Sequence, residues 1–246
     1  MLLKKQEIVL CPHPFCRSFW RSAAGEVKNL RSLLLAALMV AIRVALKSFY
    51  IPVGESLKVS FGFLFAAVGG SVYGPVLGFL GGIVSDLIGY LIAPSGAFHP
   101  IYTLIEAAAG LLYGLFTYRQ KITFGRLLLT KASVNLLINI LANSTANGIL
   151  MGKGVYYYMV PAIFKNIVML PFEVVLLALF FGALIHPITR MGLYRKEQNA
   201  LVLKPSSYVI LGIVTALILA AAIFVAFHYK EYRDAFRALV DSVFQR

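Results

Sequence analysis

Long apolar stretches separated by short polar ones make up most of the chain from about residue 30 onward. A run of about 20 apolar residues has the length of a helix that crosses a bilayer. The pattern therefore predicts an all-α integral membrane protein with a six-helix bundle and an appended seventh helix. The expected spans cover approximately residues 30–50, 61–74, 75–93, 100–118, 127–149 and 159–186, and the extra run covers 208–227.

Two groups of helix breakers divide the longest apolar stretch. Residues 61–118 contain only two charged side chains, Asp86 and Glu106, so the stretch is too long for two spans and fits three. The Tyr-Gly-Pro string at 73–75 predicts the first turn, and the Pro- and Gly-containing segment 94–100 predicts the second.

Basic residues gather between the apolar runs, in clusters at 1–31, 119–131 and 190–204. Because cytoplasmic loops carry an excess of Lys and Arg, these clusters place the N-terminus inside. The resulting division is a basic cytoplasmic segment, 1–29; a six-span membrane domain, 30–190; a basic linker, 191–206; an extra transmembrane helix, 207–228; and an amphipathic tail, 229–246.

Composition agrees with a membrane protein. Hydrophobic residues make up 60% of the chain and charged residues only 13%, whereas soluble domains are about 25% charged. The net charge of +13 lies in short loops between apolar runs, which argues against a nucleic-acid partner.

Motifs for catalysis are missing from the sequence. The string Gly148 to Gly154 has the wrong spacing for a phosphate-binding Walker A loop, so this chain is not expected to hydrolyse ATP. We see no nucleophile elbow and no metalloprotease helix, and we expect no enzyme activity and no cofactor. Cys11, His13 and Cys16 match no zinc-ligand spacing, so no metal site is expected.

Four asparagines recur at four-residue steps in the fifth predicted span: Asn135, Asn139, Asn143 and Asn147. On an α-helix this spacing forms one slowly winding stripe. Amides facing lipid would leave polar groups unpaired, so the stripe must face the protein interior or a wet cavity. Hydrogen bonding between helices explains one such residue, whereas four in register favour a polar ligand cavity.

Charged groups within or beside the spans are further candidates. Five bases gather toward the predicted outer side: Arg43, Lys47, Lys58, Lys153 and Lys165. They could neutralise an anionic ligand. Alternatively, Lys47 and Lys153 extend to lipid headgroups, and Arg43 and Lys165 pair with the acids Asp86, Glu106 and Glu173.

Small residues recur every fourth position in two places. Gly70, Gly74, Gly78 and Gly82, with Gly110 and Gly114, are expected to pack helices closely inside the bundle. Ala37, Ala41 and Ala45 make a similar face on the first span, whose other residues are bulky. That face is a candidate surface for a partner protein.

Taken in order, several strings resemble the S-component of energy-coupling factor (ECF) vitamin transporters, most closely the folate-specific subfamily. The strings are 37–41 (ALMVA), 60–64 (SFGFL), 73–75 (YGP) with Gly78 and Asp86, and 165–173 (KNIVMLPFE). The resemblance covers about residues 30–190. Two features depart from the folate pattern as it is known in the subfamily: the chain's single tryptophan is Trp20 rather than a residue of the fifth span, and Ile163 stands in the region of an expected arginine.

The resemblance implies a six-helix subunit in the prokaryotic cytoplasmic membrane, surrounded by lipid. It implies docking, through Ala37 and Ala41, on a transmembrane T-component that carries two ABC ATPase subunits. The first outer loop would gate the pocket. The ligand would be a vitamin, with folate first and riboflavin, pantothenate or a similar vitamin as alternatives; a membrane-embedded enzyme or a standalone carrier is a more distant alternative.

Folate combines a flat heteroaromatic ring, an amide and two carboxylates. A matching pocket needs amides for the ring edge, aromatic side chains for its face and bases for the carboxylates. The substrate-binding residues expected on this basis are Arg43, Lys58, Phe61, Phe63, Phe98, Asn139, Asn143 and Lys165.

Overall fold

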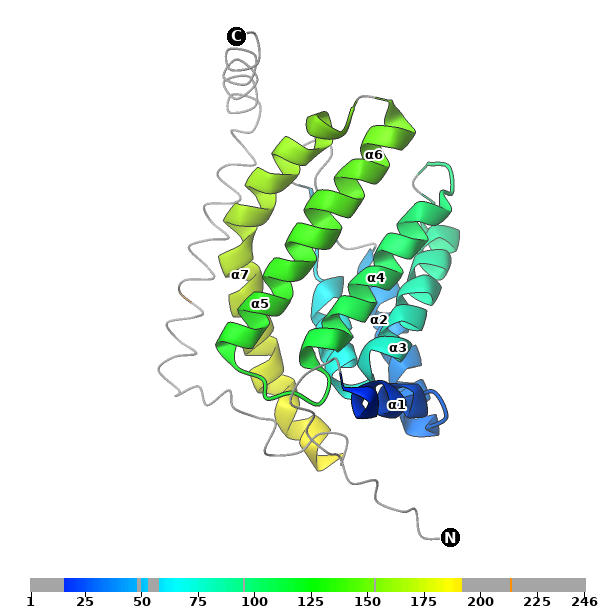
Figure 1. Ribbon diagram of the computed structural model, residues 1–246, viewed down its shortest axis with the longest axis vertical. Coiled ribbons are helices and arrows are strands. Elements are labelled where there is room, and N and C mark those ends of the chain that lie inside the picture. Colours follow the sequence, from blue (N-terminus) through cyan, green and yellow to red (C-terminus); the bar gives the residue numbers. More distant parts are fainter. Residues whose placement is uncertain are drawn as a thin grey trace.

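The computed structural model describes residues 16–47, 50–52, 58–94, 96–152, 154–191 and 213. Within them the chain forms a bundle of long helices and one short hairpin (Figure 1). The helices are α1 (Arg17–Glu26), α2 (Leu30–Lys47), α3 (Gly62–Ile92), α4 (Pro100–Thr117), α5 (Phe124–Val134), the π-helix η1 (Asn135–Ala142), α6 (Asn143–Met151) and α7 (Val155–Arg190). Strands β1 (Tyr50–Pro52) and β2 (Lys58–Ser60) pair antiparallel between α2 and α3.

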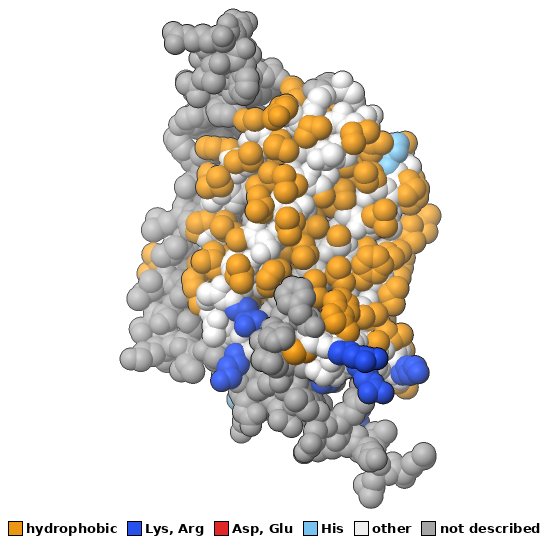
Figure 2. All heavy atoms as spheres, in the orientation of Figure 1, with side chains coloured by type: hydrophobic (Ala, Val, Ile, Leu, Met, Phe, Trp, Pro, Cys, Tyr) orange, Lys and Arg blue, Asp and Glu red, His pale blue; other side chains and the backbone are white. Residues whose placement is uncertain are grey.

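Four helical segments of the described chain are long and apolar enough to cross a membrane: α3, α4, the continuous run Phe124–Met151 and α7. The pair α1 and α2, bent by 76° where they meet, makes a fifth candidate. Hydrophobic side chains cover most of the face in Figure 2 between the two ends of the bundle. The chain is therefore a multi-pass membrane protein.

Helix α3 is interrupted where the sequence predicted a turn. Gly74 has a φ of 83° and a ψ of −177°, outside the helical region, and Pro75 follows it. A positive φ favours glycine because no Cβ opposes it. The break divides α3 into two helical segments at the expected boundary.

The glycine repeat packs α3 against α4, as expected. A Cβ added at Gly78 would lie 2.5 Å from the carbonyl oxygen of Gly110, and one added at Gly82 would lie 2.7 Å from the Cα of Ala107. Both distances are too short for any side chain. The two helices approach backbone to backbone, which is what small residues at four-residue steps allow in a membrane.

The fifth span differs from the expected uninterrupted α-helix. Residues 135–142 form a π-helix, in which each N–H bonds to the carbonyl five residues back. An α-helix turns past a full circle in four residues, and the wider π-helix turns less per residue. The π segment therefore offsets the rotation that four-residue steps would give on an α-helix, and the asparagines stay on one face of the fifth span.

Lys131 was predicted in a basic loop, and this is wrong. It belongs to α5 and is only 2% exposed. The cluster at 119–131 instead divides into a short turn before α5 and the first turns of the helix, where Arg126 is half-buried and Lys131 is buried.

The N-terminal basic segment contains an ordered element that the sequence did not reveal. Helix α1 packs through Phe19 and Ala23 against Tyr118, at the end of the bundle where α4 stops (Figure 1). The predicted linker, the seventh span and the tail lie outside the described residues, apart from Met191 and Ile213, as do Cys11 and Lys153.

Candidate ligand-binding site

A network of buried polar side chains links α5, η1 and α7. Lys131 Nζ lies 3.1 Å from Glu173 Oε1, and Asn135 Nδ2 donates to Glu173 Oε2 at 2.8 Å. Asn139 Nδ2 donates to Asn135 Oδ1 at 2.9 Å and to Asn166 Oδ1 at 3.3 Å. A charge buried in a membrane span is costly unless paired, and here the Glu173 carboxylate receives both an ammonium group and an amide.

The network has an aromatic neighbour. The Lys131 ammonium group lies 4.0 Å from the centre of the Phe63 ring, a distance at which a cation is attracted to the ring face. Phe63 follows the hairpin by three residues and is half-buried, as is Phe61. The first segment of α3 therefore places one aromatic ring, that of Phe63, against the lysine of the polar network.

The asparagine stripe continues toward the α6–α7 turn, where its hydrogen bonding changes. Asn143 is half-buried and makes no hydrogen bond to any described residue. Asn147, one turn further, accepts a hydrogen bond from the Tyr102 hydroxyl at 2.6 Å. Asn135 and Asn139 are thus hydrogen-bonded to other side chains of the network, whereas Asn143 is not bonded to them.

Lys165 on α7 directly precedes Asn166 and is half-buried. Its neighbour Asn166 is 5% exposed and donates to the carbonyl of Ala162 at 2.8 Å, within its own helix. The Lys-Asn pair of the sequence therefore brings an ammonium group to the edge of the polar network.

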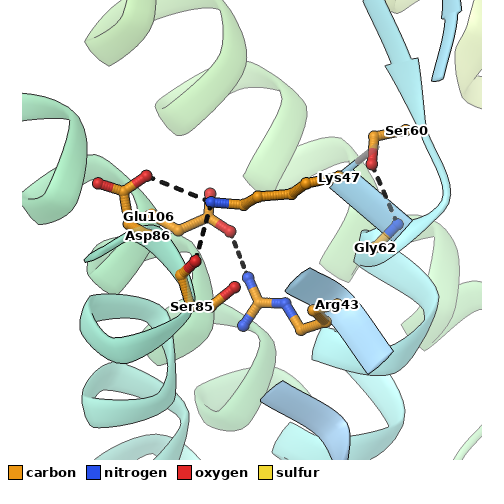
Figure 3. A network of polar contacts seen from close by, with 7 residues as sticks. All are labelled: Arg43, Lys47, Ser60, Gly62, Ser85, Asp86 and Glu106. Atoms are coloured by element: carbon orange, nitrogen blue, oxygen red, sulfur yellow. Dashed lines mark hydrogen bonds and ion pairs between the residues drawn. The ribbon is translucent and has the colours of Figure 1, made fainter. Parts of the chain in front are cut away.

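A second polar cluster joins α2, α3 and α4 (Figure 3). Arg43, 5% exposed, forms an ion pair with Glu106. Lys47 Nζ lies 3.3 Å from Asp86 Oδ1 and donates to the Ser85 carbonyl at 3.2 Å. Arg43 and Lys47 thus pair with acids of the neighbouring helices. This is the alternative left open for Arg43, whereas the expectation that Lys47 extends to lipid headgroups is wrong, because Asp86 lies within its reach.

Two other predicted substrate-binding residues, Phe98 and Lys58, lie in segments outside the helices that form the two polar clusters. Phe98 is 41% exposed in the turn before α4, and its ring contacts Tyr90 at a centroid distance of 5.2 Å. Lys58 is the first residue of β2. The structure links Phe63, through Lys131, to the network that holds Asn139; it gives Arg43 a separate partner.

Sequence reasoning missed two members of the network, Lys131 and Asn166. Glu173 was expected as an ion-pair partner of Arg43 or Lys165, and it pairs with Lys131. A signal for Lys131 was present, because it stands four residues before Asn135 and extends the stripe by one step. Its assignment to a loop hid that regularity. Asn166 and Glu173 lie seven residues apart, two turns of one helix face.

A groove runs along the outside of α2 and α3. It has a volume of about 560 Å³ and is lined entirely by apolar and small residues: Ala36, Ala37, Val40, Ala41, Val44, Ala45, Leu77, Leu80, Gly81, Val84, Ile88 and Ile92. Ala37, Ala41 and Ala45 are exposed. The small face of the first span therefore points away from the bundle, into an open groove.

Comparison with known proteins agrees with this architecture. Residues 27–194 match the model of the family described as "ECF-type riboflavin transporter, S component". The chain belongs to this family of transporter components, which are not enzymes, and membership implies ECF transporter partners and a vitamin ligand.

Individual relatives carry a different vitamin in their names. The chain is 28% identical over 151 residues to "Folate transporter FolT" of Clostridium novyi (strain NT), covering 61% of this chain and 88% of the relative. It is 28% identical over 156 residues to the protein of the same name from Leuconostoc mesenteroides, covering 59% and 82%. The solved structure titled "Crystal structure of FolT bound with folic acid" matches with a TM-score of 0.54 and 28% identity, over 59% of this chain and 88% of that one.

Proposed function

We propose that this S-component captures folate from outside the cell for ATP-driven uptake. The single observation that carries the proposal is the similarity, in sequence and in structure, to transporters named for folate, one of them solved with folic acid bound. The chain covers 88% of the solved protein, so the likeness extends over nearly the whole of that transporter.

The polar network supports a ligand of this chemistry. The amide of Asn143 suits the edge of a heteroaromatic ring, and Phe61 and Phe63 suit its face. Lys165 offers an ammonium group to a carboxylate through a charge-assisted hydrogen bond. Lys131 and Glu173 neutralise each other, so we assign them to holding α5 and α7 in place rather than to the ligand.

Riboflavin is the principal alternative, because the family description names it. Riboflavin carries no carboxylate, so the two vitamins make different demands on Lys165. A folate site loses a charge-assisted contact when Lys165 becomes Ala, whereas a riboflavin site loses none. Pantothenate, which is anionic but has no flat ring, would depend on Lys165 and not on Phe63.

We propose six crossings of the prokaryotic cytoplasmic membrane, with the N-terminus inside. The two segments of α3 on either side of Gly74 would each cross or enter the membrane, with α2, α4, the run 124–151 and α7 as the others. The hairpin then lies on the outer side, where it would gate the pocket. Residues 207–228 would add the seventh crossing.

Docking would use the exposed small face of α2. Ala37 and Ala41 line the open groove and present no bulky side chain, so a partner helix can approach the backbone closely. The proposed occupant is a helix of the T-component, which carries the two ABC ATPase subunits that supply the energy.

The deciding experiment is mass spectrometry of the small molecules that co-purify with the detergent-solubilised chain, followed by titration with folate, riboflavin and pantothenate. Folate as the retained and tightest ligand is the expected result. Tight binding of another vitamin without folate binding would overturn the folate proposal and leave the S-component class. Uptake into liposomes by the purified chain alone, without nucleotide, would indicate a standalone carrier.

A further inference from the structure

Helix α1 has one face against the protein and another that is basic and exposed. Phe19, Ala23 and Glu26 are buried, at helical spacing. The exposed residues on and just after the helix include four bases: Arg17, Arg21, Lys28 and Arg31. The buried face holds α1 against the bundle, and the exposed basic face can contact whatever lies outside the protein.

The inner side of α1 is anchored by a polar cluster. Glu26 Oε2 accepts a hydrogen bond from Ser32 Oγ at 2.5 Å. Glu26 Oε1 accepts one from the Tyr118 hydroxyl at 2.9 Å and lies 3.6 Å from Arg119 Nη2. Burial, together with the Glu26 carboxylate, raises the pKa of Tyr118, so its hydroxyl stays a donor. The helix is therefore held in one orientation.

That orientation places α1 along the membrane surface. Its axis is bent by 76° from α2, so a helix that precedes a membrane crossing runs nearly parallel to the bilayer plane. Leu30, Leu33 and Leu34 at the start of α2 are exposed and mark where the apolar zone begins. Trp20 on α1 is 41% exposed, and tryptophan is enriched at the headgroup level of membranes.

Among the described residues of α1 and the turn after it, the exposed charged side chains are all basic. The four acids of the described chain, Glu26, Asp86, Glu106 and Glu173, are each paired with a base. Figure 2 shows Lys and Arg side chains gathered at the end where α1 lies. Basic side chains beside a membrane crossing are attracted to anionic lipid headgroups.

We propose that α1 is an interfacial helix that binds anionic phospholipid headgroups through Arg17 and Arg21, with Trp20 seated at the headgroup level. The site lies away from the vitamin-binding network and does not depend on the identity of the vitamin. Binding would hold the start of α2, the helix that carries the proposed docking face, at a fixed depth in the bilayer.

Trp20 supplies the probe, because it is the single tryptophan of the chain. The full chain is reconstituted into nanodiscs that contain brominated phosphatidylglycerol or brominated phosphatidylcholine at the same mole fraction, with bromine near the headgroup. Bromine quenches tryptophan emission on contact. We expect brominated phosphatidylglycerol to quench Trp20 more strongly than brominated phosphatidylcholine. The preference for phosphatidylglycerol should fall about fivefold for each base removed, so that R17Q/R21Q loses it. High salt should abolish it as well.

The matched control is K121Q/R190Q, which removes two exposed bases outside α1 and should keep the preference. Equal quenching by the two lipids would overturn the proposal, as would a preference that R17Q/R21Q leaves unchanged. Absence of quenching by either lipid, with Trp20 emission shifting only when the ATPase subunits are added, would assign the basic face to a protein partner instead.

Discussion

Lys131 on α5 and Glu173 on α7 form an ion pair inside the helical bundle, with Nζ and Oε1 3.1 Å apart. Asn135 donates to the second carboxylate oxygen, so one acid joins two consecutive turns of the fifth span to α7. The asparagine stripe therefore serves in part to hold the fifth span against α7.

Removing one partner of this pair should destabilise the protein strongly. Lys131→Met leaves Glu173 buried without its counter-charge, and breaking a buried pair costs about 3–5 kcal/mol. Glu173→Gln should cost a similar amount. Thermal unfolding in detergent would measure both.

The double variant K131M/E173Q tests whether the loss comes from an uncompensated charge. It should be more stable than either single variant, because no buried charge remains. Losses that simply add in the double variant would show that the two residues do not act as a pair.

Asn143→Ala should weaken ligand binding about 10- to 100-fold, since losing one partner of a buried polar contact costs about 1–3 kcal/mol. Its amide makes no hydrogen bond to a described residue, so the folded protein should keep its melting temperature. Calorimetric titration with folate would measure the affinity.

Asn139→Ala is the informative comparison. That amide bonds to Asn135 and Asn166, so its loss should lower stability as well as affinity. If Asn143→Ala leaves affinity unchanged in a folded protein, the ligand does not lie at this position of the stripe.

Much of the fold could be predicted from sequence because membrane spans leave a strong pattern. Apolar length gave the positions of α4, the fifth span and α7, and the Gly74-Pro75 string gave the break in α3. The glycine spacing predicted the close contact of α3 with α4. Each of these follows from local geometry or from the requirement that apolar surface face lipid.

The site was less predictable, because pairing depends on which helices become neighbours. Nothing in the spacing of Arg43 and Glu106 says that α2 and α4 meet, so Arg43 was counted with the ligand-binding bases. Lys131 was taken as a loop base because its partner, Glu173, lies 42 positions further along the chain. The π-helix has no sequence rule comparable to the α-helical period.

Ala41→Trp should block transport while vitamin binding survives. Ala41 is exposed and lines the α2–α3 groove, so a bulky side chain fills the groove without disturbing the core. Binding to the detergent-solubilised chain and uptake in cells that hold the full transporter are the two measurements.

Leu38→Trp is the matched control, since Leu38 is 53% exposed on the same helix and does not line the groove. It should leave transport intact. Loss of vitamin binding in Ala41→Trp would mean that this face packs inside the protein, and normal transport would place the docking surface elsewhere.

Gly78→Ala should destabilise the bundle by about 1–3 kcal/mol or more, the usual cost of overpacking a filled core. The new Cβ would lie 2.5 Å from the Gly110 carbonyl oxygen and 3.1 Å from its carbon, and backbone atoms of a packed helix have little freedom to move. Helices α3 and α4 must separate, and the Asp86–Thr103 hydrogen bond between them, 2.8 Å long, should weaken as well.

Gly125→Ala is the control, because a Cβ there meets nothing within 4 Å and alanine favours the helix. Melting temperatures in detergent should fall for the first variant and stay level or rise for the second; equal melting temperatures would show that the α3–α4 contact is looser than the structure has it.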